Sequence, residues 1–116
     1  MKITGLIGHP IGHSLSPLIH NTAFELLGMD YVYLAFDVQP DYLTEALQGL
    51  VALGIAGVNV TLPHKESVIP LLDDLSSEAR AIGAVNTIVN DGGKLLGHNT
   101  DVYGFVEMMK SSSESI

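Results

Sequence analysis

One segment decides the fold: ITGLIGHPIGHSLSPLIHNTAFELLG, residues 3–28. It begins with a short apolar run, Ile3 to Gly8, whose lack of polar alternation is typical of a strand buried on both faces. Ser16 and Pro17 then indicate a helix start, with serine as the N-cap and proline at the first helical position. Apolar residues recur at helical spacing until Gly28, a natural C-terminal stop. A buried strand followed by a helix is typical of an α/β protein with a parallel sheet.

The same alternation of strands and helices continues along the chain. Further strands are predicted at 31–38, 55–60, 84–90 and 94–98, and further helices at 40–54, from 63 to 70, at 73–82 and from 99 or 100 to about 110. Asp91-Gly92-Gly93, between the last two strands, indicates a hairpin. We therefore predict a three-layer α/β/α sandwich whose mostly parallel sheet carries a terminal hairpin.

The length and composition indicate a single globular domain. The chain has 116 residues, of which 47% are hydrophobic and 16% charged, and its net charge is −8. We assign residues 1–110 to the domain and expect the serine-rich residues 111–116 to form a disordered tail. The acidic balance argues against nucleic acid as a partner. No cysteine, signal-peptide pattern or long apolar run occurs, so we expect a cytoplasmic protein with no membrane partner.

Four polar segments interrupt the apolar pattern, at predicted strand ends, at helix starts or inside short strands. They are residues 13–17, 59–65, 83–87 and 97–101. In open α/β sheets, ligands bind outside the carboxyl ends of the strands. The polar segments supply hydroxyls, side-chain amides, one lysine and one carboxylate. This set suits a small polyhydroxylated acid better than an apolar ligand.

Lys65 and Asp101 are the candidates for acid/base chemistry. Lys65 falls in the first turn of the helix predicted after Pro63, where the macrodipole disfavours a cation, so we expect its ammonium to lose a proton more easily. The alternative is a solvated surface lysine. Asp101 also lies at a predicted helix start, which favours an ionised carboxylate, and the alternative is a plain helix-terminus acid. If the fold brings them together, they form an acid/base dyad.

Hydroxyls and amides form the rest of the candidate site. Ser14 and Ser16 lie two residues apart, so in an extended segment both hydroxyls point the same way and can hold a carboxylate. Asn59 and Asn86 lie inside apolar strand runs and need partners; they are either structural hydrogen-bonding groups or ligand-facing amides. Thr61 leaves the same choice open. The histidine spacing predicts no metal site, and no glycine-rich phosphate loop occurs.

The polar segments resemble the signature of the shikimate dehydrogenase family. Residues 8–17, with His20 and Asn21, match the opening motif of the family. Residues 59–65, 83–87 and 99–101 match three further motifs, in the same order and at the same spacing. The resemblance covers residues 1 to about 110. It implies the reversible reduction of 3-dehydroshikimate to shikimate with NADPH, in aromatic amino-acid biosynthesis.

The resemblance also implies roles for individual residues. The residues it assigns to the substrate are Ser14, Ser16, Asn59, Thr61, Lys65, Asn86 and Asp101. By resemblance, the two serines bind the substrate carboxylate, while the amides, Thr61 and Asp101 hold the ring hydroxyls and the reacting oxygen. Lys65 and Asp101 form the catalytic dyad, and Lys65 helps to deliver a proton to the new hydroxyl. Serine at position 16 favours shikimate over quinate.

Members of the family continue into a Rossmann-type domain that binds NADP. We expect this domain to be absent from the chain, and the chain alone to be inactive. A second reading is a stand-alone, non-catalytic binding module for a shikimate- or quinate-like acid. A third is a nonproductive fragment that self-associates through an exposed apolar patch. The resemblance leaves a homodimer open.

Overall fold

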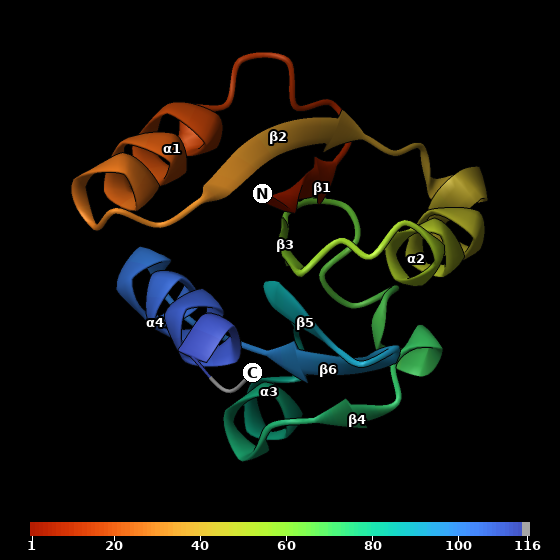
Figure 1. Ribbon diagram of the computed structural model, residues 1–116. Helices are drawn as coiled ribbons and strands as arrows, with labels where there is room; N and C mark the ends of the chain where they lie inside the picture. The colour runs from red at the N-terminus through yellow and green to blue at the C-terminus, as the bar shows by residue number, and fades with distance from the viewer. Residues whose placement is uncertain (115–116) are drawn as a thin grey trace.

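The structure, a computed structural model, describes residues 1–114, with side chains through Ser111. Its elements are β1 (Lys2–Gly8), α1 (Ser16–Leu26), β2 (Tyr31–Asp37), the 3₁₀ turn η1 (Pro40–Tyr42), α2 (Leu43–Ala52), β3 (Gly57–Val60), the 3₁₀ turn η2 (Ile69–Leu71), β4 (Asp74–Leu75), α3 (Ser77–Ile82), β5 (Thr87–Asp91), β6 (Lys94–His98) and α4 (Val102–Glu114). Figure 1 shows strands and helices alternating as the sequence predicts.

The strands form one six-stranded sheet in the order β2-β1-β3-β5-β6-β4. β1 pairs in parallel with β2 and β3, and β4 with β6, whereas β5 runs antiparallel to both its neighbours. The predicted hairpin is the β5–β6 turn, where Gly92 and Gly93 take positive φ angles of 61° and 98°. Such angles suit a two-residue hairpin loop. The mostly parallel sheet with a hairpin is confirmed, although β4 lies outside β6 and forms the edge.

Helices cover both faces of the sheet, which confirms the predicted three layers. On one face, α1 and α4 pack against the sheet through Phe24, Phe105 and Met109. On the other face, α2 and α3 pack through residues such as Leu47 and Ala79. Figure 1 shows α1 and α4 together on one side of the strands and α2 on the other.

The helix predicted from Pro63 does not form, and that prediction is wrong. Residues 61–68 form turns, and the first regular element after β3 is η2. Pro70 lacks a backbone N–H, so the segment cannot continue through it as a regular helix. The His64 ring instead donates Nε2–H to the Val38 carbonyl at 2.6 Å, with 1% of the residue exposed. This bond ties the segment to the chain just after β2.

Two further boundaries differ from the prediction. The predicted helix at 73–82 divides because β4 pairs with β6, and Ser76 then caps α3 by accepting the Ala79 N–H at 3.1 Å. At the other end of the chain, α4 continues to Glu114, so the predicted tail does not begin at residue 111. Residues 115–116 of that tail lie outside the described residues.

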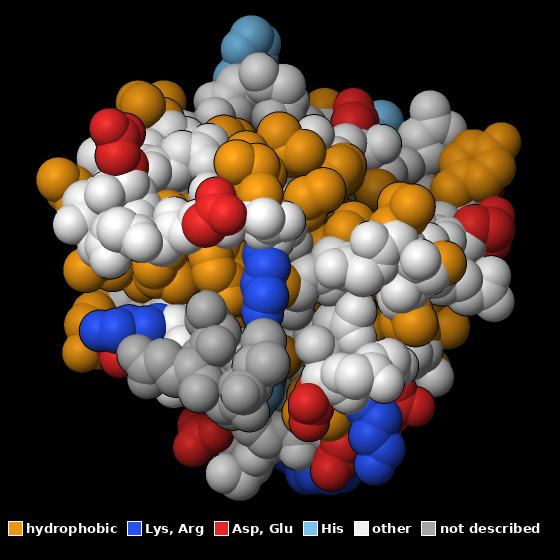
Figure 2. All heavy atoms as spheres, in the orientation of Figure 1, with side chains coloured by type: hydrophobic (Ala, Val, Ile, Leu, Met, Phe, Trp, Pro, Cys, Tyr) orange, Lys and Arg blue, Asp and Glu red, His pale blue; other side chains and the backbone are white. Residues whose placement is uncertain are grey.

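The surface near β2 carries exposed apolar side chains. Figure 2 shows hydrophobic side chains gathered over β2 and toward α2. A hollow of about 220 Å³ lies there, lined by residues that include Phe36, Val38 and Leu53. Along the described part of the chain, none of the helices has both the length and the apolar character needed to cross a membrane.

Candidate functional site

The strand registers bring the four polar segments together at one end of the strands, which we call the site edge of the sheet. The carboxyl end of β3 and the amino end of β5 coincide there, because Asn59 pairs with Thr87. Thr87 in turn pairs with His98, the last residue of β6. Ile7, near the end of β1, pairs with Val60. Loops leaving β1, β3 and β6 and the loop entering β5 therefore meet at the same edge, where an α/β sheet holds its ligands.

Three predicted site residues line a single hollow at this edge. Ser14, Ser16 and Thr61 line a cavity of about 300 Å³, which we call the serine pocket. The rest of its lining is Leu6, Pro10, Ile11, Gly12 and His13. This volume is at the lower end of the range for small-molecule sites. The neutral hydroxyl donors suit an anionic group such as a carboxylate.

The cap of α1 differs from the prediction. The residue at the N-cap is Leu15, whose side chain makes no capping bond, so Ser16 is not the N-cap. The Ser14 Oγ instead accepts the backbone N–H of Ser16 at 3.1 Å. A backbone N–H at the start of α1 therefore has Ser14 as its side-chain acceptor, whereas the sequence analysis expected Ser16 to be the capping residue. This bond also fixes the two serines relative to each other beside the serine pocket.

Asn59 and Asn86 belong to one hydrogen-bonded cluster. Both amides therefore have structural hydrogen-bond partners, and their contact with a ligand stays a prediction. Asn59 Nδ2 donates to Thr87 Oγ1 at 3.1 Å and, with longer geometry, to the Asn86 carbonyl at 3.4 Å. Asn86 Nδ2 donates to the Thr100 carbonyl at 2.7 Å, and Asn86 Oδ1 accepts the Thr100 N–H at 2.8 Å. The Thr87 and Thr100 hydroxyls lie 2.8 Å apart. The amides therefore join β3, β5 and the loop after β6.

Asp101 caps α4, as expected for an acid at a helix start. Its Oδ1 accepts the Gly104 N–H at 2.7 Å, and the side chain is exposed. Asn99 donates to the Ala84 carbonyl at 3.1 Å. Thr100, held by Asn86, immediately precedes this carboxylate. The position of Asp101 is thus set from both sides, by the helix and by the amide cluster.

Lys65 lies in the turns after β3, and it is half-buried. Its backbone carbonyl accepts the Val85 N–H at 2.8 Å, which brings the second polar segment beside the third. Because no helix begins at Pro63, the macrodipole argument made for Lys65 does not hold. Among the described residues, no ion pair joins Lys65 to Asp101; the pairs found are between the N-terminal amine and Asp30, His9 and Asp37, and Arg80 and Asp74.

Sequence reasoning missed two residues behind the site, Tyr33 and His20. The Tyr33 hydroxyl donates to Asn59 Oδ1 at 2.8 Å, and the Tyr33 ring stacks on the His20 ring with centroids 4.1 Å apart. Burial raises the pKa of Tyr33 well above its usual value. The signal available in the sequence was a tyrosine inside a buried strand, because a buried hydroxyl needs a partner.

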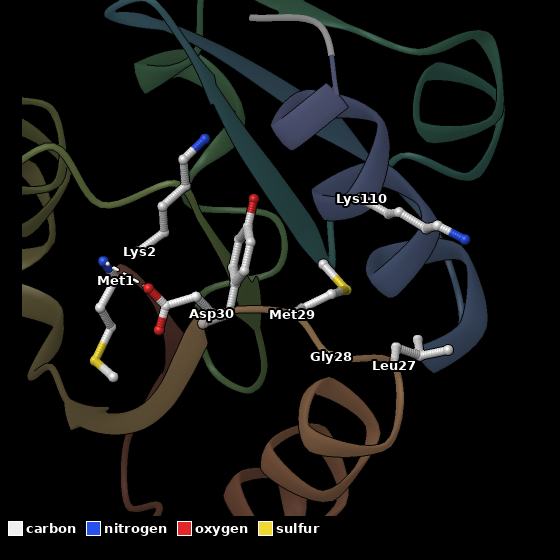
Figure 3. A pocket seen from close by; sticks show the side chains of 8 residues that line it. Met1, Lys2, Leu27, Gly28, Met29, Asp30 and Lys110 are labelled. Atoms are coloured by element: carbon white, nitrogen blue, oxygen red, sulfur yellow. Dashed lines mark ion pairs between the residues drawn. The ribbon is translucent and has the colours of Figure 1, made fainter.

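A second hollow, of about 490 Å³, lies at the opposite edge of the sheet and holds none of the predicted site residues. Lys2 and Lys110 both line it, but Figure 3 shows their side chains pointing away from each other. Asp30 is paired there with the N-terminal amine at 3.1 Å. The geometry therefore offers no converging pair of cations for an anion. Within residues 1–114, no group of three or more histidine, aspartate or glutamate side chains is placed to hold a metal ion.

Known proteins similar to the chain agree on one family. Residues 6–88 match the model of the shikimate dehydrogenase substrate binding domain. The NADP(+) shikimate dehydrogenases of Caldanaerobacter subterraneus subsp. tengcongensis and Pelodictyon phaeoclathratiforme are 57% and 58% identical over 99% of this chain. A crystal structure of shikimate 5-dehydrogenase from Listeria monocytogenes, in complex with shikimate and NAD, is 48% identical, with a TM-score of 0.84 over 97% of this chain and 39% of that one.

The matches cover nearly all of this chain but less than half of each relative. The chain spans 41% of the length of each of the two curated relatives, while those relatives align with nearly all of the chain. The family model covers the loop after β1, the end of β3 and the start of β5, and the alignment with the relatives also extends over β6 and the loop after it. The chain belongs to the family of shikimate dehydrogenase substrate-binding domains.

Proposed function

We propose that this chain is the substrate-binding part of an NADP-dependent shikimate dehydrogenase. The longer enzyme would reduce 3-dehydroshikimate to shikimate reversibly, in aromatic amino-acid biosynthesis. The observation that carries the proposal is the meeting of all four polar segments at one sheet edge, with Ser14, Ser16 and Thr61 around a single pocket. The family assignment and the relatives named NADP(+) shikimate dehydrogenases support it.

Substrate binding follows from the chemistry of the donors. The Ser14 and Ser16 hydroxyls would hold the carboxylate, because hydroxyl groups donate hydrogen bonds to its oxygens. Thr61 and the amides of Asn59 and Asn86 would hold the ring hydroxyls. The amide cluster fixes the orientation of both amides before any ligand arrives, which reduces the entropy lost on binding.

Lys65 and Asp101 would handle the proton. In the direction of reduction, Lys65 would help to deliver a proton to the oxygen that becomes the new hydroxyl, and Asp101 would hold that oxygen. The cofactor, when bound, supplies the hydride. Asp101 Oδ1 accepts the Gly104 N–H, which fixes the carboxylate at the start of α4. Asp101 would thereby be positioned to hold the reacting oxygen while Lys65 delivers the proton.

The described residues do not fit NADP. The loop between β1 and α1 is not a glycine-rich dinucleotide turn, and the serine pocket is lined by hydroxyls and one histidine rather than by a phosphate cradle. We place cofactor binding in the remainder of a longer enzyme. The chain alone would therefore bind substrate without turning it over. We also propose that the protein is cytoplasmic and that it forms a homodimer.

The first test is a titration of the ¹⁵N-labelled chain with shikimate, followed by amide NMR. We expect dispersed peaks and saturable shifts at Ser14, Thr61, Asn86 and Asp101. Dispersed peaks that do not move would remove the alternative of a stand-alone binding module. Broad peaks and a high sedimentation coefficient would support the third reading, a self-associating fragment.

The second test is a chimaera in which this chain replaces the aligned part of the Caldanaerobacter subterraneus enzyme. We expect NADP-dependent oxidation of shikimate. Lys65→Ala should then lower kcat far more than it weakens shikimate binding, and Ser14→Ala should weaken binding with less effect on kcat. A folded chimaera that binds shikimate but has no activity would support the binding module instead. A folded chimaera that does not bind shikimate would refute the proposed function.

A further inference from the structure

Tyr33 occupies the centre of the contacts that join α1 to the sheet. The residue is 1% exposed, and its ring stacks on the His20 ring, with centroids 4.1 Å apart and an interplanar angle of 8°. Asn21, the next residue on α1, brackets the Tyr33 backbone: its Nδ2 donates to the Tyr33 carbonyl at 3.0 Å, and its Oδ1 accepts the Tyr33 N–H at 2.8 Å. Two consecutive residues of α1 thus hold both the ring and the backbone of Tyr33.

The same helix turn holds Ser16. His20 Nδ1 lies 2.8 Å from the Ser16 carbonyl, and because a carbonyl only accepts, Nδ1 carries the hydrogen. His20 Nε2 is then a buried acceptor for which the described residues provide no donor. Burial lowers the pKa of His20, and the bond to Ser16 opposes this effect. His20 is therefore a neutral ring that fixes the Ser16 carbonyl on one edge and supports Tyr33 on its face.

We propose that Tyr33 is a positioning residue, whose hydroxyl sets the Asn59 amide in the orientation that binds the ligand. This inference rests on the proposed function, because Asn59 is one of its contacts to the ring hydroxyls. Tyr33 is not placed among the residues that touch the ligand.

One hydrogen bond links the buried phenol to the candidate site. Tyr33 donates its single proton to Asn59 Oδ1 at 2.8 Å. With Oδ1 engaged, the Asn59 Nδ2 must face the other way, toward Thr87 Oγ1 at 3.1 Å. Tyr33 thereby holds Oδ1 on one side of the Asn59 amide, while the Asn86 carbonyl and Thr87 accept from Nδ2 on the other. Without the hydroxyl, Asn59 Oδ1 loses its donor.

The experiment compares Tyr33→Phe with Tyr31→Phe. Tyr31 is a matched control because it lies on the same strand, is 9% exposed and donates its hydroxyl to the Met109 carbonyl at 2.9 Å, with no bond to Asn59. Shikimate affinity is measured in the chain, or in the chimaera if only the chimaera binds. We expect Tyr33→Phe to weaken binding about tenfold and Tyr31→Phe to change it less than about twofold.

An NMR signal measured without ligand distinguishes a failure of this inference from a failure of the proposed function. The Asn59 side-chain NH₂ resonances should shift in Tyr33→Phe, whereas those of Asn90, which bonds the Ile55 carbonyl, should not. An unchanged Asn59 signal, or equal losses of affinity in Tyr33→Phe and Tyr31→Phe, would overturn the positioning role. If neither wild-type protein binds shikimate, the proposed function and the ligand part of the inference both fail, and the Asn59 signal still decides whether Tyr33 orients that amide.

Discussion

Asn86→Ala tests whether the amide cluster holds the loop that carries Asp101. The substitution removes two bonds to the Thr100 backbone, of 2.7 and 2.8 Å, and one from the Thr87 hydroxyl, of 3.1 Å. At about 1 kcal/mol for each net hydrogen bond, the free energy of unfolding should fall by about 3 kcal/mol. With a urea m-value of about 1.5 kcal/mol/M, the midpoint should fall by about 2 M.

The matched control is Asn90→Ala, on β5, the strand that Asn86 immediately precedes. Asn90 makes two side-chain bonds, to the Ile55 carbonyl at 3.0 Å and from the Gly93 N–H at 2.9 Å, so its loss should cost about 2 kcal/mol. Only Asn86→Ala should also move the amide resonances of residues 99–101. The measurements are urea unfolding followed by circular dichroism and amide NMR of each variant. A loss below about 1 kcal/mol in Asn86→Ala, or unmoved resonances at 99–101, would refute the reasoning.

Three further outcomes test the packing, the charges and a cap. A Cβ on Gly97 would lie 2.6 Å from Leu72 Cδ1, so Gly97→Ala should lower the free energy of unfolding by about 1–3 kcal/mol in urea titrations; an unchanged midpoint would contradict this. Burial lowers the pKa of His20 and of His98, so the unfolded chain binds protons first as the pH falls below about 6.5, and stability should decrease from pH 7 toward pH 5; urea midpoints that do not fall over that range would argue against it. Ser76→Ala should cost about 1 kcal/mol through loss of the α3 cap, and thermal unfolding with no decrease in melting temperature would count against that role.

The layers of the fold could be predicted because each helix and strand has a strong local pattern. Glycines that end α1 and α2 have φ angles of 66° and 67°, as their place after an apolar stretch indicated. The segment after β3 could not be predicted in this way, because Pro63 favours a helix start locally while the buried contact of His64 with Val38 depends on the tertiary fold. β4 was missed for the same reason, since its pairing with β6 is not visible in its own sequence.

The site could be predicted in content but not in geometry. The sequence supplied the serines, amides, lysine and carboxylate, and the registers bring them to one edge. Which atom bonds which partner depends on strands far apart in sequence, so the cluster around Asn86 was not accessible. The local bond of Asp101 to Gly104 agrees with the predicted place of Asp101 at a helix start. The functional roles of these residues stay predictions until ligand binding is measured.

The bracket that Asn21 makes around the Tyr33 backbone has a consequence for solubility. β2 is the outer strand of the sheet beside β1, and an open strand edge offers its backbone to any other chain. Asn21 occupies both polar groups of Tyr33 on that open side, as a rung of a neighbouring strand would. One side-chain amide therefore blocks the middle of the edge against edge-to-edge stacking between copies, and Asn21→Ala should make the protein precipitate at lower concentration.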